Sequence, residues 1–406
     1  MVVKNPKRSD DGEGRDLSRL NRSKRLRRAS IEDVARLSGV SRQTVSRVIN
    51  ESGYVADATR ERVQAAIAQL GYQPSQTARA LATSHTRMIG VIAGGINYYG
   101  PISTISALGQ TAREYGYFIV LANVDERKLT EEEFRSVVTG FRSLGVEAYV
   151  LVAPTDAMIR AIKRMEFSVP CVIVTGSDGA ENLEEWLRMK ESVMAVGIDQ
   201  WNAMHRISRI CLSQSDTVYY FSGPLAWRDA YTRQKAIIHA YEDGRAEKKG
   251  ELFVIPVGSW EAEAGYDQAV KLLSHLEAKE SEENHDMVCL VCANDLLALG
   301  VLRAISEKPW ADVQGKRLRN RYFVCGYDDM PGSDNAQPPL TTVHPDFHAL
   351  GVLAIQLILS RLDPSDGGHQ ASVDALNASQ RCGVWQIPAS VAVRHSLTPG
   401  LWAENN

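Results

Sequence analysis

Short apolar runs, separated by stretches with a helical pattern, recur along the sequence from residue 89 to residue 327. Each run is apolar at successive positions, which is typical of parallel strands that are buried on both faces in α/β units. The runs cover residues 89–93, 118–122, 148–152, 171–175, 218–222, 253–256, 287–292 and 322–327. This alternation predicts two doubly wound parallel α/β subdomains, with a ligand cleft between them at the carboxyl ends of the strands.

The pattern of residues 29–73 is different and predicts a small all-α domain. Ser30 and Asp33 have the spacing of a capping box at the start of a first short helix. After a glycine turn, Ser41 is placed to cap a second helix. A third amphipathic helix is expected over residues 59–70. Three short helices within about fifty residues match the size of a DNA-binding domain.

The second of these helices is expected to present a polar face to solvent, because its apolar residues face the first helix. In a helix-turn-helix, this helix enters the major groove, where a bidentate Arg suits guanine and a bidentate Gln suits adenine. Arg42, Gln43 and Arg47 are therefore candidate base readers. The short donors suited to phosphate oxygens are Ser41, Thr44, Ser46 and Asn50. Spacing alone also fits an ordinary capped pair of polar helices.

Charge is distributed unevenly along the chain. Residues 1–87 contain 17 Lys and Arg against 9 Asp and Glu, whereas residues 88–406 contain 29 against 40. A basic head on an acidic body is expected of a nucleic-acid-binding module joined to a regulatory or catalytic domain. Residues 1–28 have ten basic side chains and few large apolar ones, which predicts a disordered arm. This arm is either an electrostatic tether to DNA or a solvated tail.

The composition and the motifs of the chain exclude several classes of protein. The chain is 44% hydrophobic and 23% charged, the balance of an ordinary globular protein. No stretch approaches the roughly 18 apolar residues of a membrane span, so we expect a cytoplasmic, nucleoid-associated protein with no membrane contact. Cys289 and Cys292 form a C-x-x-C, but in a strand they would point to opposite faces and could not share a metal or a disulfide. No diagnostic catalytic motif is present, so no catalytic residue, metal site or cofactor is predicted.

A resemblance adds to this interpretation. Residues 30–92 resemble, nearly position by position, the amino-terminal signature of the LacI/GalR family of bacterial transcription regulators. The resemblance implies a helix-turn-helix head with a hinge helix, followed by a periplasmic-binding-protein-like sensor domain. Further family landmarks follow in the expected order at residues 221–225, 258–260, 292–295, 326–329, 338–342 and 393–396. The implied boundaries are a basic arm (1–28), a helix-turn-helix domain (29–73), a hinge helix and linker (74–86), an effector-binding and dimerisation domain (87–396) and a tail (397–406).

The family resemblance also implies a function and a set of partners. It implies a homodimeric, sequence-specific regulator, expected to be a repressor, which binds a pseudo-palindromic double-stranded operator and a small-molecule effector, expected to be a sugar. The alternative is a cytoplasmic small-molecule sensing protein with degenerate DNA recognition. Leu81 of each subunit is expected to wedge into the minor groove at the operator centre. The other DNA contacts implied by the resemblance are Tyr54, Thr59, Tyr72 and Ala78.

Effector contacts are likewise implied by the resemblance. Trp260 matches a position where an aromatic ring stacks on a sugar face, and Asn294 and Asp328 match positions that hydrogen-bond effector hydroxyls. The full set of expected contacts is Tyr98, Tyr231, Arg233, Trp260, Asn294, Asp328 and Phe347. Tyr231 stands where sugar-responsive relatives commonly carry Arg, and Thr175 stands where they often carry Asp. This member therefore has either a different effector or a partly decayed site.

Overall fold

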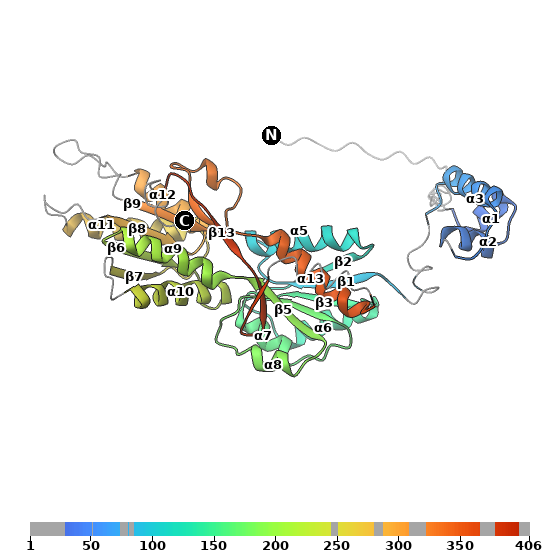
Figure 1. Ribbon diagram of the computed structural model, residues 1–406, viewed down its shortest axis with the longest axis horizontal. Helices are drawn as coiled ribbons and strands as arrows, with labels where there is room; N and C mark the ends of the chain where they lie inside the picture. Colours follow the sequence, from blue (N-terminus) through green and yellow to red (C-terminus); the bar gives the residue numbers. More distant parts are fainter. Residues whose placement is uncertain are drawn as a thin grey trace, which may run out of the picture. The chain divides into compact units, whose positions relative to one another are not determined.

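The computed structural model describes residues 29–50, 52–73, 80, 85–244, 251–279, 287–307, 322–365 and 378–397. The chain divides into two compact units, residues 1–85 and residues 86–406 (Figure 1). The predicted arm, most of the predicted hinge helix with Ala78 and Leu81, and the tail from residue 398 lie outside the described residues. Within the described part, no helix has the length and apolar character needed to cross a bilayer.

Three helices make up the described part of the amino-terminal unit. They are α1 (Ile31–Ser38), α2 (Arg42–Ile49) and α3 (Asp57–Leu70). Val34, Val45 and Val63, one from each helix, are fully buried in a common core. Helix α3 begins two residues before its predicted start, because the sequence pattern marked its apolar face and not its first turn. The acidic Asp57 in that turn is favourable next to the positive end of the helix dipole.

Side-chain caps set the boundaries of the first two helices. The capping box is confirmed: Ser30 Oγ accepts from the Asp33 amide at 3.3 Å, and the Asp33 carboxylate accepts from the Ser30 amide at 3.0 Å. Ser41 Oγ accepts from the amide of Thr44 at 3.1 Å, which caps α2 as predicted. Leu37 is 46% exposed, because its position in the helical turn lies off the packed face.

The second unit contains two lobes, each built on one sheet with its helices (Figure 1). In the first lobe the strand order is β11-β12-β5-β4-β3-β1-β2, and in the second it is β13-β10-β9-β8-β6-β7. All neighbouring pairs are parallel except β11 with β12 and β13 with β10. The first-lobe strands are β1 (Met88–Ala93), β2 (Phe118–Asn123), β3 (Ala148–Val152), β4 (Cys171–Val174), β5 (Val193–Ile198), β11 (Ser379–Arg381) and β12 (Val384–Ile387). The second-lobe strands are β6 (Thr217–Ser222), β7 (Glu251–Pro256), β8 (Val288–Cys292), β9 (Tyr322–Tyr327), β10 (Thr341–Pro345) and β13 (Ala389–Ala392).

Helices cover the sheets and complete an α/β fold with two doubly wound lobes, as predicted. Their bounds are α5 (Tyr99–Glu114), α6 (Glu131–Ser143), α7 (Asp156–Lys163), α8 (Glu184–Arg188), α9 (Gln200–Gln214), α10 (Arg228–Gly244), α11 (Ala262–Lys279), α12 (Asp295–Glu307) and α13 (Phe347–Leu362). In the first lobe, α5 and α13 share one core with the sheet, and α6, α7 and α8 share the core on its other face. In the second lobe, α9 lies beside α10, and α11 beside α12.

The chain passes between the lobes three times. It passes from β5 into α9, from β10 into α13, and from β12 into β13, each time through a one-residue connection. As a result, α9 belongs to the second lobe, whereas α13, β11 and β12 return to the first. These crossings place the carboxyl ends of both sheets around the space between the lobes, which is where open parallel sheets bind ligands.

Each of the eight predicted runs forms a strand, with bounds within two residues of the prediction. Two of them are not buried on both faces as expected. Strands β2 and β7 lie at the edges of their sheets, so Phe118 is 52% exposed and Phe253 is 45% exposed. Five further strands in the described part of the chain, β5 and β10 to β13, were not among the predicted runs.

Candidate functional site

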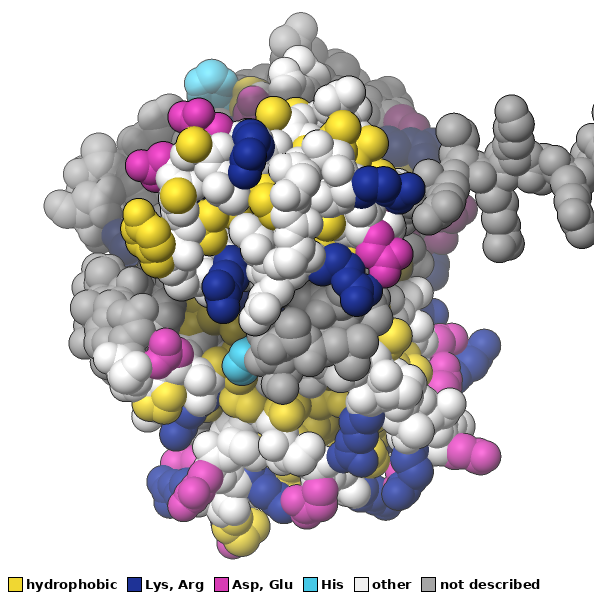
Figure 2. Space-filling model, turned by 90° about the vertical axis from the view of Figure 1, so that its right-hand side faces the viewer, with side chains coloured by type: hydrophobic (Ala, Val, Ile, Leu, Met, Phe, Trp, Pro, Cys, Tyr) yellow, Lys and Arg dark blue, Asp and Glu magenta, His cyan; other side chains and the backbone are white. Residues whose placement is uncertain are grey.

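One face of α2 is available for contact with a partner. Arg42, Gln43 and Arg47 are exposed, whereas Val45 and Val48 are buried against the other helices. Figure 2 looks onto the amino-terminal unit, in which basic side chains stand apart from one another among polar and apolar ones. The candidate base readers are thus held on a capped, well-packed helix with their side chains directed away from the core.

The short polar residues of α2 already make local contacts. Ser41 is the helix cap, and the side-chain amide of Asn50 donates to Ser46 Oγ at 3.2 Å. Arg42 Nη1 lies 2.8 Å from Glu32 Oε1, with 68% and 59% of the two side chains exposed. An ion pair this exposed contributes about 0–1 kcal/mol, so Arg42 can exchange Glu32 for another acceptor at little cost.

The remaining predicted DNA contacts in this unit lie in different environments. Tyr54 follows α2 and is 92% exposed. Thr59 lies in the first turn of α3 and is half-buried. Tyr72 packs against the core of the three helices, and burial raises the pKa of its hydroxyl. Tyr72 therefore has a structural contact in this unit whether or not it also reaches DNA.

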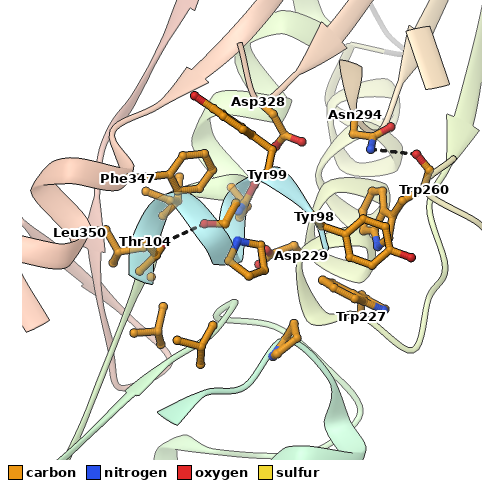
Figure 3. Close-up of a pocket in the computed structure, with 18 of the residues that line it drawn as sticks. Tyr98, Tyr99, Thr104, Trp227, Asp229, Trp260, Asn294, Asp328, Phe347 and Leu350 are labelled. Atoms are coloured by element: carbon orange, nitrogen blue, oxygen red, sulfur yellow. Dashed lines mark hydrogen bonds between the residues drawn. The ribbon is translucent and has the colours of Figure 1, made fainter. Parts of the chain in front are cut away.

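A pocket with a volume of about 80 Å³ lies between the two lobes (Figure 3). Its walls come from the carboxyl ends of β3, β4 and β5 in the first lobe and of β8 and β9 in the second, together with the first turns of α5, α9, α10 and α13. Six of the seven predicted effector contacts line this pocket: Tyr98, Arg233, Trp260, Asn294, Asp328 and Phe347. The prediction thus brought together residues that are far apart along the chain.

Tyr231 does not line the pocket. It lies on α10 between Asp229 and Arg233, which both face the pocket. Because residues four apart share a helix face and the residue midway points away, Tyr231 is turned from the cavity. Its ring instead lies 5.6 Å from the ammonium group of Lys235.

Arg233 is the central cation of the pocket, and its side chain is 4% exposed. Its guanidinium donates to Gln200 Oε1 at 2.8 Å, to the Ala293 carbonyl at 2.5 Å and to Asp328 Oδ1 at 3.4 Å. It also stacks 3.5 Å from the centroid of the Tyr327 ring. These contacts fix the guanidinium plane, so its remaining N–H groups have a defined direction.

Two carboxyl groups, those of Asp229 and Asp328, line the pocket together with Arg233. Burial raises the pKa of Asp328 to about 7 against the opposing effect of Arg233, and burial also raises the pKa of Asp229. Asp328 has a φ of 114°, a strained conformation for a residue other than glycine. Asp229 accepts no hydrogen bond from any other described side chain or amide. The pocket therefore offers acceptors for a ligand that donates hydrogen bonds.

Aromatic rings close one side of the pocket. The ring of Trp227 meets Trp260 edge-on at 5.7 Å and Tyr98 at 5.1 Å. Trp260 is 5% exposed, and its indole N–H has no acceptor among the described residues. Asn294 caps α12 through its oxygen and donates to the Trp260 carbonyl at 3.1 Å, so both ends of its amide are engaged. Asn294 positions Trp260 as well as facing the cavity.

Sequence reasoning missed Trp227 and Asp229, which both line the pocket. Asp229 could have been found, because it lies four residues before Arg233 and so shares its helix face. A weaker signal for Trp227 is the glycine at position 95. Its φ of 69° favours glycine, and a Cβ atom there would collide with the Trp227 ring. The partner of that glycine is apparent only in the folded chain.

The two lobes are joined beside the pocket by Arg228, which the sequence analysis also missed. Its side chain is 1% exposed, and Nη1 lies 2.6 Å from Oδ1 of Asp156 on α7. The same guanidinium donates to the carbonyls of Gly176 at 3.0 Å, Ser177 at 3.2 Å and Glu181 at 3.0 Å. A second-lobe cation is therefore fully surrounded by first-lobe acceptors.

Three buried cysteines of the second lobe form a cluster that the C-x-x-C motif does not predict. Cys289 lies with Cys211 and Cys325 in the core of the second lobe, with the three Sγ atoms within 4.8 Å of one another. Cys292 is not in this group, which agrees with the expectation that a strand points Cys289 and Cys292 to opposite faces. The expectation considered only local spacing, so it missed the long-range cluster.

Comparisons with known proteins agree with this architecture. Residues 30–75 match a model described as bacterial regulatory proteins of the lacI family, and residues 230–382 match a periplasmic binding protein-like domain. The chain is 27% identical to the lactose operon repressor of Escherichia coli K12, over 82% of this chain and 85% of the relative. It is 29% identical to the transcriptional repressor PurR of Mannheimia succiniciproducens, over 84% of this chain and 94% of the relative.

A solved structure of the lac repressor dimer bound to operator and the anti-inducer ONPF is similar as well. Its TM-score is 0.69 at 25% identity, over 90% of this chain and 98% of that chain. A helix-turn-helix unit, followed by a two-lobed domain with a pocket between its lobes, defines a DNA-binding transcriptional regulator that responds to a small molecule. The chain thus combines a DNA-binding domain of the lacI type with a periplasmic-binding-protein-like domain, and the relatives it resembles are lac and PurR repressors.

Proposed function

We propose that this chain is a sequence-specific repressor whose affinity for its operator is set by a small molecule bound between the two lobes. The observation that carries the proposal is the exposed face of α2, with Arg42, Gln43 and Arg47 directed away from the core. The same chain has a pocket between its two lobes. The proposed role is binding and not catalysis, and the proposed location is the cytoplasm, at the nucleoid.

The edge strands support a homodimer. Apolar side chains on β2 and β7, including Phe118 and Phe253, are exposed and are an aggregation hazard unless another surface covers them. A second copy is the proposed cover, and two-fold symmetry would then present two α2 helices to two half-sites of a pseudo-palindrome. The Leu81 wedge at the operator centre remains part of this proposal.

A carbohydrate is the proposed effector. Hydroxyl groups can donate to Asp229 and Asp328, while the rings of Trp260 and Phe347 supply apolar contact. The cavity of about 80 Å³ is smaller than the roughly 150 Å³ that is known to admit benzene. In this proposal the lobes separate further when a sugar binds. We propose that the effector favours one arrangement of the lobes and the operator favours the other. Each ligand then weakens the binding of the other by the same factor.

Selection of bound duplexes from a randomised pool, at near-physiological salt, tests the proposal and requires neither a known operator nor a known effector. We expect enrichment of a palindrome with a flexible central pyrimidine–purine step. The double variant Arg42→Ala, Gln43→Ala should lose the enrichment while keeping weak, salt-sensitive binding. If the wild-type chain enriches no sequence, the better account is the alternative, a small-molecule sensing protein with degenerate DNA recognition.

A further inference from the structure

Helices α9 and α10 bring two imidazoles and a carboxylate together on the surface of the second lobe, away from the residues that line the pocket. His205 Nε2 lies 3.2 Å from Asp243 Oδ2, and His239 Nδ1 lies 3.0 Å from the same oxygen. All three donor atoms lie within 4.8 Å of one another. These described residues thus bring nitrogen and oxygen donors together at one place, and the proposed function does not use them.

Helix geometry explains why the three donors converge. His239 and Asp243 are four residues apart on α10, so they share one face of that helix. His205 reaches the same place from α9, which packs along α10. The side chains of His205, His239 and Asp243 are 27%, 48% and 45% exposed, so an ion from solvent can reach them and keep water in its remaining positions.

The distances between the donor atoms suit a transition-metal ion. Zinc bonds to imidazole nitrogen and carboxylate oxygen are about 2.0–2.2 Å long, so two ligands at roughly tetrahedral or octahedral angles lie about 2.9–3.5 Å apart. The two nitrogen-to-oxygen distances, 3.2 Å and 3.0 Å, fall within that interval. An ion bound by all three groups would take the place of the two hydrogen bonds between the imidazoles and Asp243.

We propose that His205, His239 and Asp243 form a binding site for a divalent transition-metal ion of the zinc class. Two imidazoles with one carboxylate favour such an ion over Mg²⁺ or Ca²⁺, which prefer oxygen ligands alone. The ion joins α9 to α10. The same two helices are already joined at the pocket, where Arg233 Nε donates to Gln200 Oε1 at 2.8 Å. The metal therefore holds the helix pair that supplies part of the pocket wall.

Titration of the full, untagged chain with Zn²⁺ by calorimetry, after treatment with a chelator, tests this site. We expect one tight equivalent and a higher melting temperature with Zn²⁺. His239→Ala and His205→Ala should each lower the affinity at least tenfold. His344→Ala is the matched control, because His344 also contacts a carboxylate, Asp329 at 2.9 Å, but belongs to no three-donor group among the described residues. His344→Ala should bind Zn²⁺ as the wild type does.

Visible absorption with Co²⁺ as the probe distinguishes this site from the buried thiols. We expect a spectrum with nitrogen and oxygen ligands that disappears in His239→Ala. An intense near-ultraviolet thiolate band would assign binding to Cys211, Cys289 and Cys325 and would overturn the proposal. Absence of Zn²⁺ binding to the wild type, or equal affinity in His239→Ala and wild type, would overturn it too.

Discussion

Nη1 of Arg228 lies 2.6 Å from Oδ1 of Asp156, and this contact crosses from the second lobe to the first. Because both partners are sheltered from water, the pair is held in one geometry and screened little by salt. The lobes cannot separate without hydrating the guanidinium or finding it new acceptors. The contact therefore sets part of the cost of opening the pocket.

Replacing Arg228 with Met should destabilise the second unit and open it. Removing one partner of a buried ion pair costs about 3–5 kcal/mol, since the other charge is left uncompensated. Urea unfolding should show a loss of this size, and X-ray scattering should show a larger radius of gyration. Arg188→Ala is the control: its pair with Glu184 is exposed, so the expected loss is below about 1 kcal/mol. Equal losses in the two variants would contradict a role for the contact between lobes.

The raised pKa of Asp328 predicts a pH dependence of stability. The folded chain holds a proton up to a pH of about 7, whereas an unfolded Asp loses it near a pH of about 3.9. This contribution to stability is fully present below about pH 4 and is lost as the pH rises toward and through 7. Chemical unfolding at a series of pH values should show a flatter profile for Asp328→Asn than for wild type. Asp334→Asn, at an exposed position, should keep the wild-type profile.

Arg42 is expected to read a base, so its removal should change preference and not affinity alone. Loss of a bidentate contact to guanine should cost about 1–3 kcal/mol of discrimination at one base pair in each half-site. Sequencing of duplexes selected by Arg42→Ala would measure this. Arg36→Ala removes an equal charge from α1, where Arg36 pairs with Asp33. It should weaken binding to all sequences alike, and the same pattern in Arg42→Ala would exclude base reading.

The exposed edge strands predict where a dimer can be broken. Phe118→Asp on β2 and Phe253→Asp on β7 each place a charge on a surface that we expect to be buried between copies. Analytical ultracentrifugation at micromolar concentration should show monomers for these variants. Met189→Asp is the control, because Met189 is 68% exposed directly after α8 and lies on neither edge strand. A wild-type dimer that persists in both Phe variants would place the interface elsewhere.

The fold class and eight strands could be predicted because successive apolar residues mark parallel strands, including the edge strands β2 and β7. Strand β10 was missed for a physical reason. Thr341 and Thr342 are buried hydroxyl residues, and they are stable there because Thr342 donates to Asp295 at 2.5 Å and Thr341 to the Arg394 carbonyl at 2.9 Å. Such pairing depends on residues far away in the chain and leaves no local pattern.

The pocket shows the same division between local and long-range information. Family resemblance led to Arg233, Trp260 and Asp328, which lie at strand ends or near helix starts, where position along the chain determines position in space. It did not show which face of α10 points into the cavity, so Tyr231 was assigned to the cavity and Asp229 was not. Arg228 was missed because its acceptors lie in the other lobe.

The late pairing of β12 with β5 has a consequence for how the chain is made. Val384 pairs with Ala195, and Thr342 pairs with Ala392, so both sheets receive a strand from the last part of the sequence. While a ribosome is still synthesising the chain, β5 has an open edge on which other strands can pair. Neither lobe is complete before the strands near residue 390 emerge. A nascent chain can thus present a finished α1 to α3 unit to DNA before it is able to respond to any ligand.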